Sequence, residues 1–396
     1  MIKFRSIAIL VLAEIAGMSL WFTSSATLPD MMREATIAPI AQALMASGVQ
    51  AGFVIGALAS AFLGIADRYD PRRVFAACAV LAATANAGLL IAPIGGELAI
   101  VLRILTGALL AGVYPVGMKI AVGWGTKDRG LLIGLLVGAL TIGSAAPHLL
   151  AFIGGADWRL AIAVTSILAA TGGLLAYGIH LGPHHSKAPA FDARAIFVAW
   201  TDKRIRLAVG GYLGHMWELY AMWAWIGVAA AASYGMSMAA DNAAEFAKLT
   251  AFLAIGLGGL VCIPAGAVAD RIGKAQLTII AMAISGSAAL LTAFTFGGAP
   301  MISFIVILIW GISIVPDSAQ FSALVADAGP PELAGSLMTL QTALGFSLTI
   351  VTVQATPALA AQFGWPPILA VMALGPAFGI LAMVPLLKNS NKATQD

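Results

Sequence analysis

Long, nearly uninterrupted apolar runs occupy most of the chain. Their residues do not alternate with polar ones, as they would in the strands of a membrane β-barrel. Gly and Ala are spread among them, and such small residues let membrane helices pack closely. Runs of about 20 residues, enough for a helix to cross a bilayer, fall at 7–28, 46–66, 74–95, 98–124, 130–153, 158–181, 206–232, 246–269, 275–297, 301–326, 333–357 and 364–387. The pattern predicts an all-α membrane protein with twelve transmembrane helices.

The basic residues of the predicted loops gather on one side of the membrane. With both termini placed in the cytoplasm, the loops on the other side contain only Arg33, Arg159 and Lys248. The cytoplasmic segments contain Lys3, Arg5, Arg68, Arg72, Arg73, Lys127, Arg129, Lys187, Arg194, Lys203, Arg204, Arg206, Arg271, Lys274, Lys388 and Lys392. Because basic residues favour the cytoplasmic side of a membrane protein, this asymmetry predicts cytoplasmic termini and an even number of spans.

The composition agrees with exposure to lipid. Hydrophobic residues make up 60% of the chain and charged residues 10%, whereas soluble domains contain about 25% charged residues. The basic residues lie in short loops rather than in one patch, so nucleic acid is not an expected partner. The two cysteines, Cys78 and Cys262, both lie inside apolar runs. They are interpreted as core residues, since their spacing provides neither a disulfide framework nor a metal site.

The two halves of the chain share short patterns at a nearly constant offset. The Glu-x-x-x-Met-x-x-Trp pattern that starts at Glu14 recurs at Glu218, with an offset of 204. The Asp-Arg pair at 67–68 recurs at 270–271, with an offset of 203. Agreeing offsets favour an ancient duplication into two like-oriented halves. The predicted domains are an N-terminal six-helix bundle (1–181), a cytoplasmic linker (182–205), and a C-terminal six-helix bundle with a short cytoplasmic tail (206–396).

One loop carries a recognisable motif. Residues 266–274 read Gly-Ala-Val-Ala-Asp-Arg-Ile-Gly-Lys and resemble the loop signature G-x-x-x-D-R-x-G-K of the major facilitator superfamily. The first-half copy departs from it, because Asp70 and Pro71 replace the usual Gly and basic residue. Arg103-x-x-x-Gly107 resembles a second family signature. In the family such loops latch one half to the other, which implies gating roles for Asp67, Arg68, Gly266, Asp270, Arg271, Gly273 and Lys274. Simple anchoring of the loops in the cytoplasm is the alternative.

The resemblance implies the major facilitator fold and secondary active transport by alternating access. The expected cargo is a small organic solute, moved with H⁺ by a monomer in the lipid bilayer of a bacterial inner membrane, without a metal or cofactor. Several stretches, such as 20–22, also resemble nitrate/nitrite-type porters. Those porters hold their anion with arginines within helices 2 and 8, and the corresponding spans here contain none. A small-anion porter and a non-transporting sensor on the same scaffold are the alternatives. An enzyme is not expected, since no H-E-x-x-H or G-x-S-x-G motif is present where it could act.

A few charged residues lie within the apolar spans, where each carries a free-energy cost and therefore needs a reason. They are Glu14, Arg103, Lys119, Glu218 and Asp317, and they fall in helices 1, 4, 7 and 10, which line the central cavity in the family. Aromatic and polar residues accompany them on the same helices. The candidate substrate-binding and proton-binding residues are Glu14, Trp21, Arg103, Lys119, His215, Glu218, Tyr220, Trp225, Asp317 and Gln320.

The charged candidate residues of the first half are weighed between structure and transport, and Glu14 either shares in carrying the coupling proton or, if paired with Lys119, serves structure or gating. Arg103 is interpreted as a hydrogen-bonding anchor between helices. Lys119 lies sixteen residues further on, about 160° around an ideal helix, so both can face the cavity only if Pro115 kinks the helix. Glu14 and Lys119 should lie at similar depth and are predicted to form an ion pair. His148, in the fifth span, is interpreted as a core histidine with its hydrogen bonds satisfied.

The candidate residues of the second half are expected to serve transport. Glu218 lies near the middle of its span and is predicted to carry the coupling proton. His215 lies three residues earlier on nearly the same face, where it could relay that proton. Asp317 follows Pro316, and its role is left open between function and structure. An acid beside Trp225 and other aromatic rings suits a cation or an amphipathic organic molecule.

Overall fold

The computed structural model describes residues 1–125, 128–155, 157–185 and 191–390, and all regular secondary structure in them is helical. The first half of the chain forms α1 (Ile2–Met18), α2 (Thr23–Glu34), α3 (Pro39–Leu63), α4 (Ile65–Arg68), α5 (Pro71–Ala87), α6 (Glu97–Leu110), α7 (Tyr114–Val122), α8 (Arg129–Ile153) and α9 (Trp158–Leu175). The remainder forms α10 (Arg194–Thr201), α11 (Lys203–Tyr234), α12 (Ala240–Ile272), α13 (Lys274–Thr295), α14 (Pro300–Ser313), α15 (Ser318–Ala328), α16 (Ala334–Phe363), α17 (Trp365–Met372) and α18 (Leu374–Ser390).

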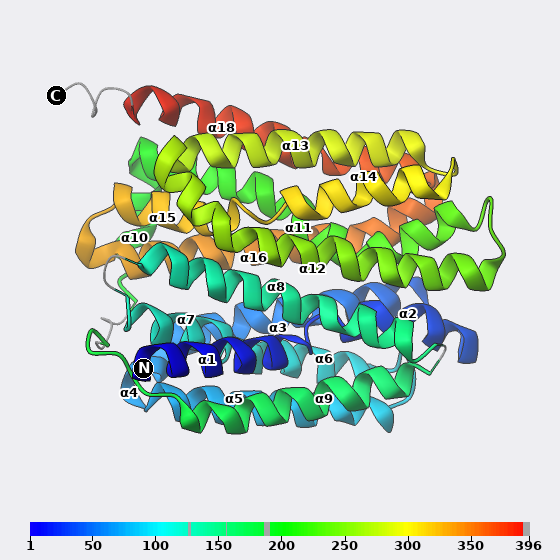
Figure 1. Cartoon of the computed structure of the whole chain (residues 1–396), viewed down its shortest axis with the longest axis horizontal. Coiled ribbons are helices and arrows are strands. Elements are labelled where there is room, and N and C mark those ends of the chain that lie inside the picture. The colour runs from blue at the N-terminus through cyan, green and yellow to red at the C-terminus, as the bar shows by residue number, and fades with distance from the viewer. Residues whose placement is uncertain (126–127, 156, 186–190, 391–396) are drawn as a thin grey trace.

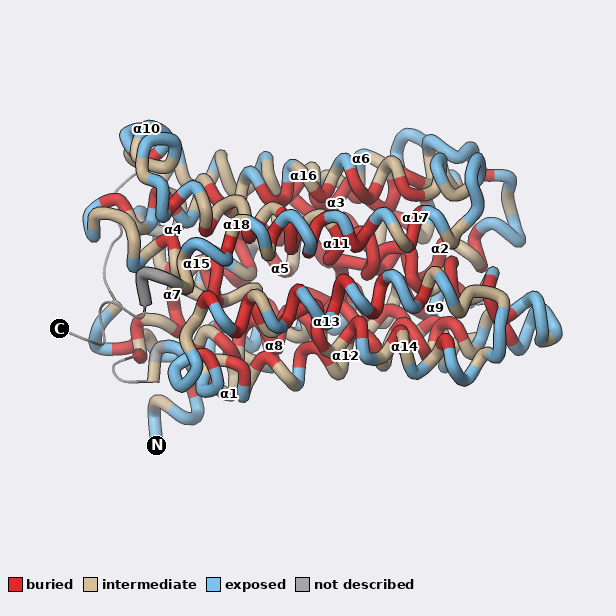
Figure 2. Tube along the Cα trace, turned by 90° about the horizontal axis from the view of Figure 1, so that it is seen from above, coloured by how far each residue is buried: buried red, intermediate tan, exposed pale blue. Residues whose placement is uncertain are grey.

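The long helices run side by side along the long axis of the molecule (Figure 1). The start of α1 and the end of α18 lie at the same end of this arrangement, which we call the terminal end, and the other is the opposite end. The two halves of the chain contact each other mainly where α8 packs on α12 and α3 packs on α16. Buried positions gather on the inner sides of the helices, and exposed positions lie on the outer sides and at both ends (Figure 2).

Eleven helical segments of the described chain are long and apolar enough to cross a membrane, so the protein is an integral membrane protein. One predicted span, 206–232, is not among these eleven segments. It lies within α11. This helix has 32 residues, about 48 Å at 1.5 Å per residue. It is not among the segments apolar enough to cross a membrane, since His215, Glu218 and its Trp and Tyr residues lower its mean hydropathy. The twelfth transmembrane helix therefore remains a prediction.

Four of the predicted spans are interrupted near their middle. The first is divided between α1 and α2 at 19–22, the fourth between α6 and α7 at 111–113, the tenth between α14 and α15 at 314–317, and the last between α17 and α18 at 373. Pro115 and Pro316 lie at two of these breaks, where the missing N–H of proline removes a helical hydrogen bond. A break is thus present next to Pro115, the condition under which Arg103 and Lys119 could both face the cavity. The break at 314–317 brings Asp317 to His215 of α11.

Small residues set the spacing of the α8–α12 contact. A Cβ built at Gly138 would lie 2.7 Å from the carbonyl oxygen of Gly259, and one built at Gly259 would lie 2.9 Å from that of Gly138. No side chain larger than hydrogen fits there without moving the helices. This is the close approach that the Gly and Ala content predicts for packed membrane helices.

The predicted linker is partly helical. It contains α10, which packs against α11 and α16, and the backbone N–H of Asp192 donates to the hydroxyl of Ser336 at 2.9 Å. Ala195 is buried within a small apolar cluster that includes Ile205 and Leu337. Residues 186–190 of the linker and 391–396 of the tail lie outside the described residues. The linker also contacts the first half, where the ring centroids of Phe191 and Phe62 of α3 lie 5.4 Å apart. It is therefore packed against both halves.

Candidate functional site

An aromatic cluster fills the centre of the molecule between the two halves. Its members are Trp21 and Phe22 from the break in the first span, Phe53 from α3, Tyr220 and Trp223 from α11, and Phe346 from α16. Neighbouring ring centroids lie between 4.6 Å (Phe53 and Phe346) and 6.0 Å (Phe22 and Tyr220). Every member is at most 5% exposed. We call these six residues the central aromatic cluster; it closes the space between the halves in this conformation.

Glu14 is completely buried beside this region, and neither of its carboxyl oxygens has a hydrogen-bond partner among the described residues. A Cβ built at Gly117 would lie 2.5 Å from Oε2 of Glu14 and 3.4 Å from the ring of Phe75. The carboxyl group therefore lies against the backbone of α7. An ionised carboxylate without a partner is costly in such surroundings, so the group is stable here when it carries a proton.

The predicted ion pair between Glu14 and Lys119 is not formed among the described residues. The reason is the orientation of α7. Gly117 faces Glu14, and Lys119, two residues further on, lies about 200° around the helix. The lysine side chain thus leaves α7 on the other side, where it is half-buried.

Glu218 is also completely buried, but it accepts two hydrogen bonds. Ser285 of α13 donates its hydroxyl to Oε1 at 2.5 Å, and Trp310 of α14 donates its indole N–H to Oε2 at 3.1 Å. The acid thus links three helices of the second half. Trp310 was not among the candidate site residues predicted from the sequence, and the structure makes it a partner of Glu218.

His215 lies beside Asp317, and the expected relay from His215 to Glu218 is not formed. Its Nδ1 is 3.1 Å from Oδ1 of Asp317, although neither atom makes a well-directed hydrogen bond. Its Nε2 is 2.9 Å from the hydroxyl of Ser318. Both partners lie at the break between α14 and α15, which brings them to α11. Burial is almost complete for His215, Glu218 and Asp317, which are each at most 1% exposed.

Arg103 makes the interhelical hydrogen bonds expected of a structural anchor. It donates to Oδ1 of Asn86 at 2.9 Å and to the carbonyls of Leu20 and Trp21 at 3.1 and 2.6 Å. These carbonyls belong to the break between α1 and α2, where the helix leaves them without partners. Arg103 therefore holds the interrupted helix that carries both Glu14 and Trp21.

Trp225 and Gln320, the remaining predicted site residues, are buried but make no contact with the central aromatic cluster that the structure records. Trp225 donates its indole N–H to the carbonyl of Val353 in α16 at 2.9 Å and is outside the central aromatic cluster. Gln320 is buried on α15, three residues after Asp317. His148 is buried, but its Nε2 has no partner among the described residues, so the expectation of a satisfied core histidine is wrong.

Several central residues are absent from the sequence-based set. Gln341 of α16 is fully buried with both amide atoms unpartnered, and the indole N–H groups of Trp21 and Trp223 are unpartnered too, within the described chain. Gln341 could have been noticed as a polar residue inside an apolar span. Phe53, Phe346 and Ser285 carry no such signal, because aromatic and hydroxyl residues are common throughout the spans.

A buried ion pair joins the two halves at the opposite end. Nζ of Lys248, at the start of α12, is 2.7 Å from Oδ2 of Asp30 in α2, and the two side chains are only 9% and 1% exposed. Lys248 also donates to the carbonyl of Gly155 at 2.8 Å. Sequence reasoning placed Lys248 in a loop as a topology marker. The structure makes it part of a buried contact between the two halves on this side.

The family-type loop motif at the terminal end makes no such buried ion pair among the described residues. Asp270 and Arg271 are exposed, and Asp270 makes no side-chain hydrogen bond or ion pair with any described residue. Lys274 pairs with Asp327 at 2.5 Å within the second half. Gly273 has φ +96°, a value suited to glycine, between α12 and α13. The side chain of Asp67 lies outside the described residues, whereas Arg68 is exposed and Gly266 faces α8. Among the described side chains, Asp270 thus forms no contact with the first half, and its latch role stays a prediction.

Comparison with known proteins gives one family profile and several solved structures of similar fold. The sequence profile described as Major Facilitator Superfamily matches residues 9–353. The structure is similar to the xylose transporter XylE from E. coli in a partially occluded inward-open conformation, with a TM-score of 0.71, 14% identity, and coverage of 98% of this chain and 97% of that one. It is also similar to a variant of the nucleoside transporter NupG, with a TM-score of 0.70, 15% identity, and coverage of 96% and 99%. No curated protein sequence matches the chain.

Proposed function

The chain belongs to the Major Facilitator Superfamily, and we propose that it moves a small organic solute across the membrane by alternating access, driven by protons. The observation that carries the proposal is the pair of buried acids, Glu14 and Glu218, beside an aromatic cluster shared by both halves. The ion pair between Asp30 and Lys248 closes one end of this centre. A centre with one closed end is the arrangement that alternating access requires.

Proton coupling rests on what each acid can do when its surroundings change. Glu14 has no partner among the described residues, so it holds a proton while the centre is closed and releases it when water reaches it. Glu218 already has two donors, which hold its carboxyl group between α13 and α14. One acid without a partner and one with two donors, both beside the same centre, support a role for the pair in loading and releasing a proton.

The substrate class follows from the groups that would face an opened centre. Trp21, Tyr220 and Trp223 present aromatic faces, two of them with free indole donors, and Gln341 presents a free amide. Such a site suits a flat or amphipathic organic solute with a few hydrogen-bonding edges, neutral or cationic. The small-anion alternative gains no support, because Arg103 is already bound to three protein acceptors. XylE and NupG, by their names transporters of xylose and nucleosides, are compatible with an organic cargo.

We place the terminal end in the cytoplasm of a bacterial inner membrane, since the basic loops predict that orientation. In this orientation the closed Asp30–Lys248 gate faces outward, and the unlatched Asp270 loop faces inward. The structure would then represent a state closed to the outside. We propose that a single chain is the transporting unit, because the centre is built entirely from one chain.

The test is transport by the protein in vesicles, with a panel of organic cations, neutral solutes and small anions. Wild type should concentrate one of them when a pH gradient is imposed. Glu14→Gln and Glu218→Gln should each abolish this accumulation but keep exchange at equal concentrations, because exchange needs no net proton movement. Glu97→Gln, at an exposed acid that opens α6, is the matched control and should transport normally. Accumulation by both test variants with an unchanged pH profile would exclude the proton role.

A further inference from the structure

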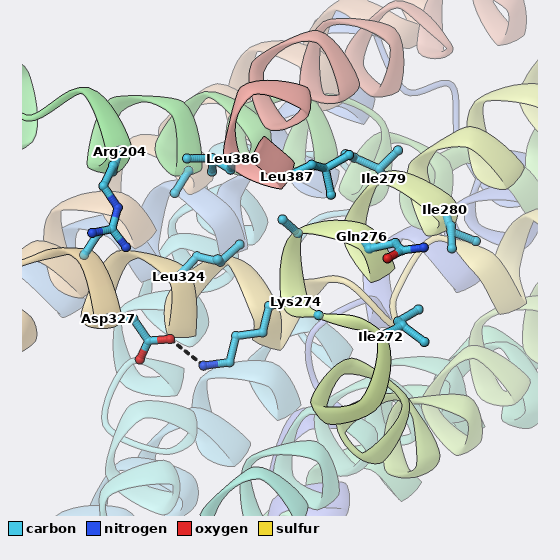
Figure 3. Close-up of a pocket in the computed structure, with 14 residues that line it drawn as sticks. Arg204, Ile272, Lys274, Gln276, Ile279, Ile280, Leu324, Asp327, Leu386 and Leu387 are labelled. Atoms are coloured by element: carbon cyan, nitrogen blue, oxygen red, sulfur yellow. Dashed lines mark hydrogen bonds and ion pairs between the residues drawn. The ribbon is translucent and has the colours of Figure 1, made fainter. Parts of the chain in front are cut away.

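A pocket of about 720 Å³ lies at the terminal end of the second half, away from the central site. The start of α11, the α12–α13 turn, and the last turns of α15 and α18 surround it (Figure 3). No residue of the central aromatic cluster and neither buried acid lines it. The proposed transport function therefore does not account for this pocket.

The pocket is charged at one end and apolar at the other. In Figure 3, Arg204, Lys274 and Asp327 lie toward one side, and Leu387, Ile279 and Ile280 toward the other. Lys274 is paired with Asp327. The guanidinium of Arg204 makes no hydrogen bond or ion pair with any residue that the structure describes, so the charged end has one uncompensated positive charge.

The apolar end continues into the outer surface of the helices. Ile280 is 41% exposed and Ile284, one turn further along α13, is 45% exposed. On α18, Leu381 and Val384 are also exposed. A surface of this kind on a membrane helix lies against lipid chains. An occupant of the pocket could thus keep its polar part at Arg204 and its apolar part along the membrane-facing side of α13 and α18.

We propose that this pocket binds one anionic phospholipid. The phosphate lies at Arg204 and Lys274, and an acyl chain lies along Ile279, Ile280 and Leu387. Basic pockets between membrane helices bind anionic headgroups through such charge complementarity, and the apolar wall adds burial of the chain. A phosphate at Lys274 competes with Asp327 for the same ammonium group, so the bound lipid changes how the loop motif is tied to α15.

The experiment measures lipid retained by the full chain in detergent, by mass spectrometry of the intact complex, during titration with phosphatidylglycerol. Arg204→Gln should weaken retention about fivefold, the effect of about 1 kcal/mol for one basic residue at an anionic lipid surface. Gln276→Glu, an exposed pocket residue, should weaken it too, by repulsion. Lys203→Gln is the matched control, one residue from Arg204 but not part of the lining.

The same titration separates other occupants. Phosphatidylethanolamine should bind less than phosphatidylglycerol, and soluble glycerol phosphate should not displace the lipid. If glycerol phosphate displaces it fully, the pocket is a site for a free phosphate compound and the proposal is wrong. Equal losses in Arg204→Gln and Lys203→Gln would reduce the effect to general surface charge and would also overturn it. Because the readout is binding, the result does not depend on whether transport is driven by protons.

Discussion

Glu14 and Glu218 hold matching positions in the two halves of the chain, yet their surroundings differ. Glu14 has no partner for either carboxyl oxygen among the described residues. Glu218 is held by Ser285 and Trp310 from two neighbouring helices. The comparison shows that a repeated sequence pattern preserved the position of an acid in the fold but not its chemistry.

The sequence explains how the difference arises. With the offset of 203 seen for the Asp-Arg pairs, the counterpart of Ser285 is Ala82, which has no donor. With the offset of 204 seen for the two acids, the counterpart of Trp310 is Thr106, whose hydroxyl donates to the carbonyl of Leu102. The first half thus lacks both groups that hold the acid of the second half. Two side-chain donors thus hold Glu218 in place, whereas no described residue donates to Glu14.

The largest expected effect is a difference between two equivalent substitutions. Glu218→Met leaves the indole N–H of Trp310 without its acceptor and removes the bond from Ser285, so it should lower the free energy of unfolding by about 3 kcal/mol. Glu14→Met breaks no hydrogen bond and replaces a poorly solvated acid with an apolar side chain, so stability should be unchanged or raised. Thermal unfolding in detergent measures both. Equal destabilisation by the two substitutions would mean that Glu14 makes a stabilising contact as strong as those of Glu218.

A smaller loss of stability is expected from changing Trp310, which donates a hydrogen bond to Glu218. Trp310→Phe removes only the indole N–H that Glu218 accepts and should cost about 1–2 kcal/mol of unfolding free energy. Trp223→Phe is the matched control, because the Trp223 indole N–H has no partner among the described residues and a similar ring area is changed. The same unfolding assay compares them. If the two variants lose the same stability, ring packing rather than the hydrogen bond sets the value.

Ser285 should contribute less than Trp310. Ser285→Ala removes the bond to Glu218 but also a weaker one to the carbonyl of Met282 at 3.2 Å, and the expected loss is about 1 kcal/mol. Ser287→Ala, two residues further on, provides the control, since Ser287 is exposed and bonds only to the carbonyl of Ala283 in its own helix. A loss in Ser287→Ala as large as in Ser285→Ala would argue that the Glu218 contact adds nothing.

The smallest effect on stability is expected at Gly117. The methyl group of Gly117→Ala would meet the end of the Glu14 side chain at 2.5 Å, and a flexible chain end can move aside for less than about 1 kcal/mol. Proton-driven accumulation should nevertheless fall, because the carboxyl group is displaced. Gly130→Ala is the control, with no atom within 4 Å of the added Cβ. Normal accumulation by a well-folded Gly117→Ala would separate Glu14 from the coupling step.

The sequence was informative wherever a property depends on one segment at a time. Transfer of a helix into lipid is a sum over its own residues, so the apolar runs located the membrane helices, and the loop motif of residues 266–274 indicated the family that the profile match confirms. The same local reasoning identified Arg103 as an anchor and Pro115 as a possible kink. It also predicted a helix at 206–232, which is part of α11, although this helix is not among the segments apolar enough to cross a membrane.

The tertiary structure decided which side chains meet. A shift of one residue rotates a helical side chain by 100°, so depth alone could not tell whether Glu14 would meet Lys119 or the bare backbone of Gly117. His215 lies beside Asp317 because the break between α14 and α15 brings Asp317 to α11. Lys248 pairs with Asp30 of α2 because α12 packs on α8, which also contacts α2. Each of these contacts joins residues about one hundred or more positions apart. Their formation depends on the rotation and break points of several helices at once, which no single segment of sequence encodes.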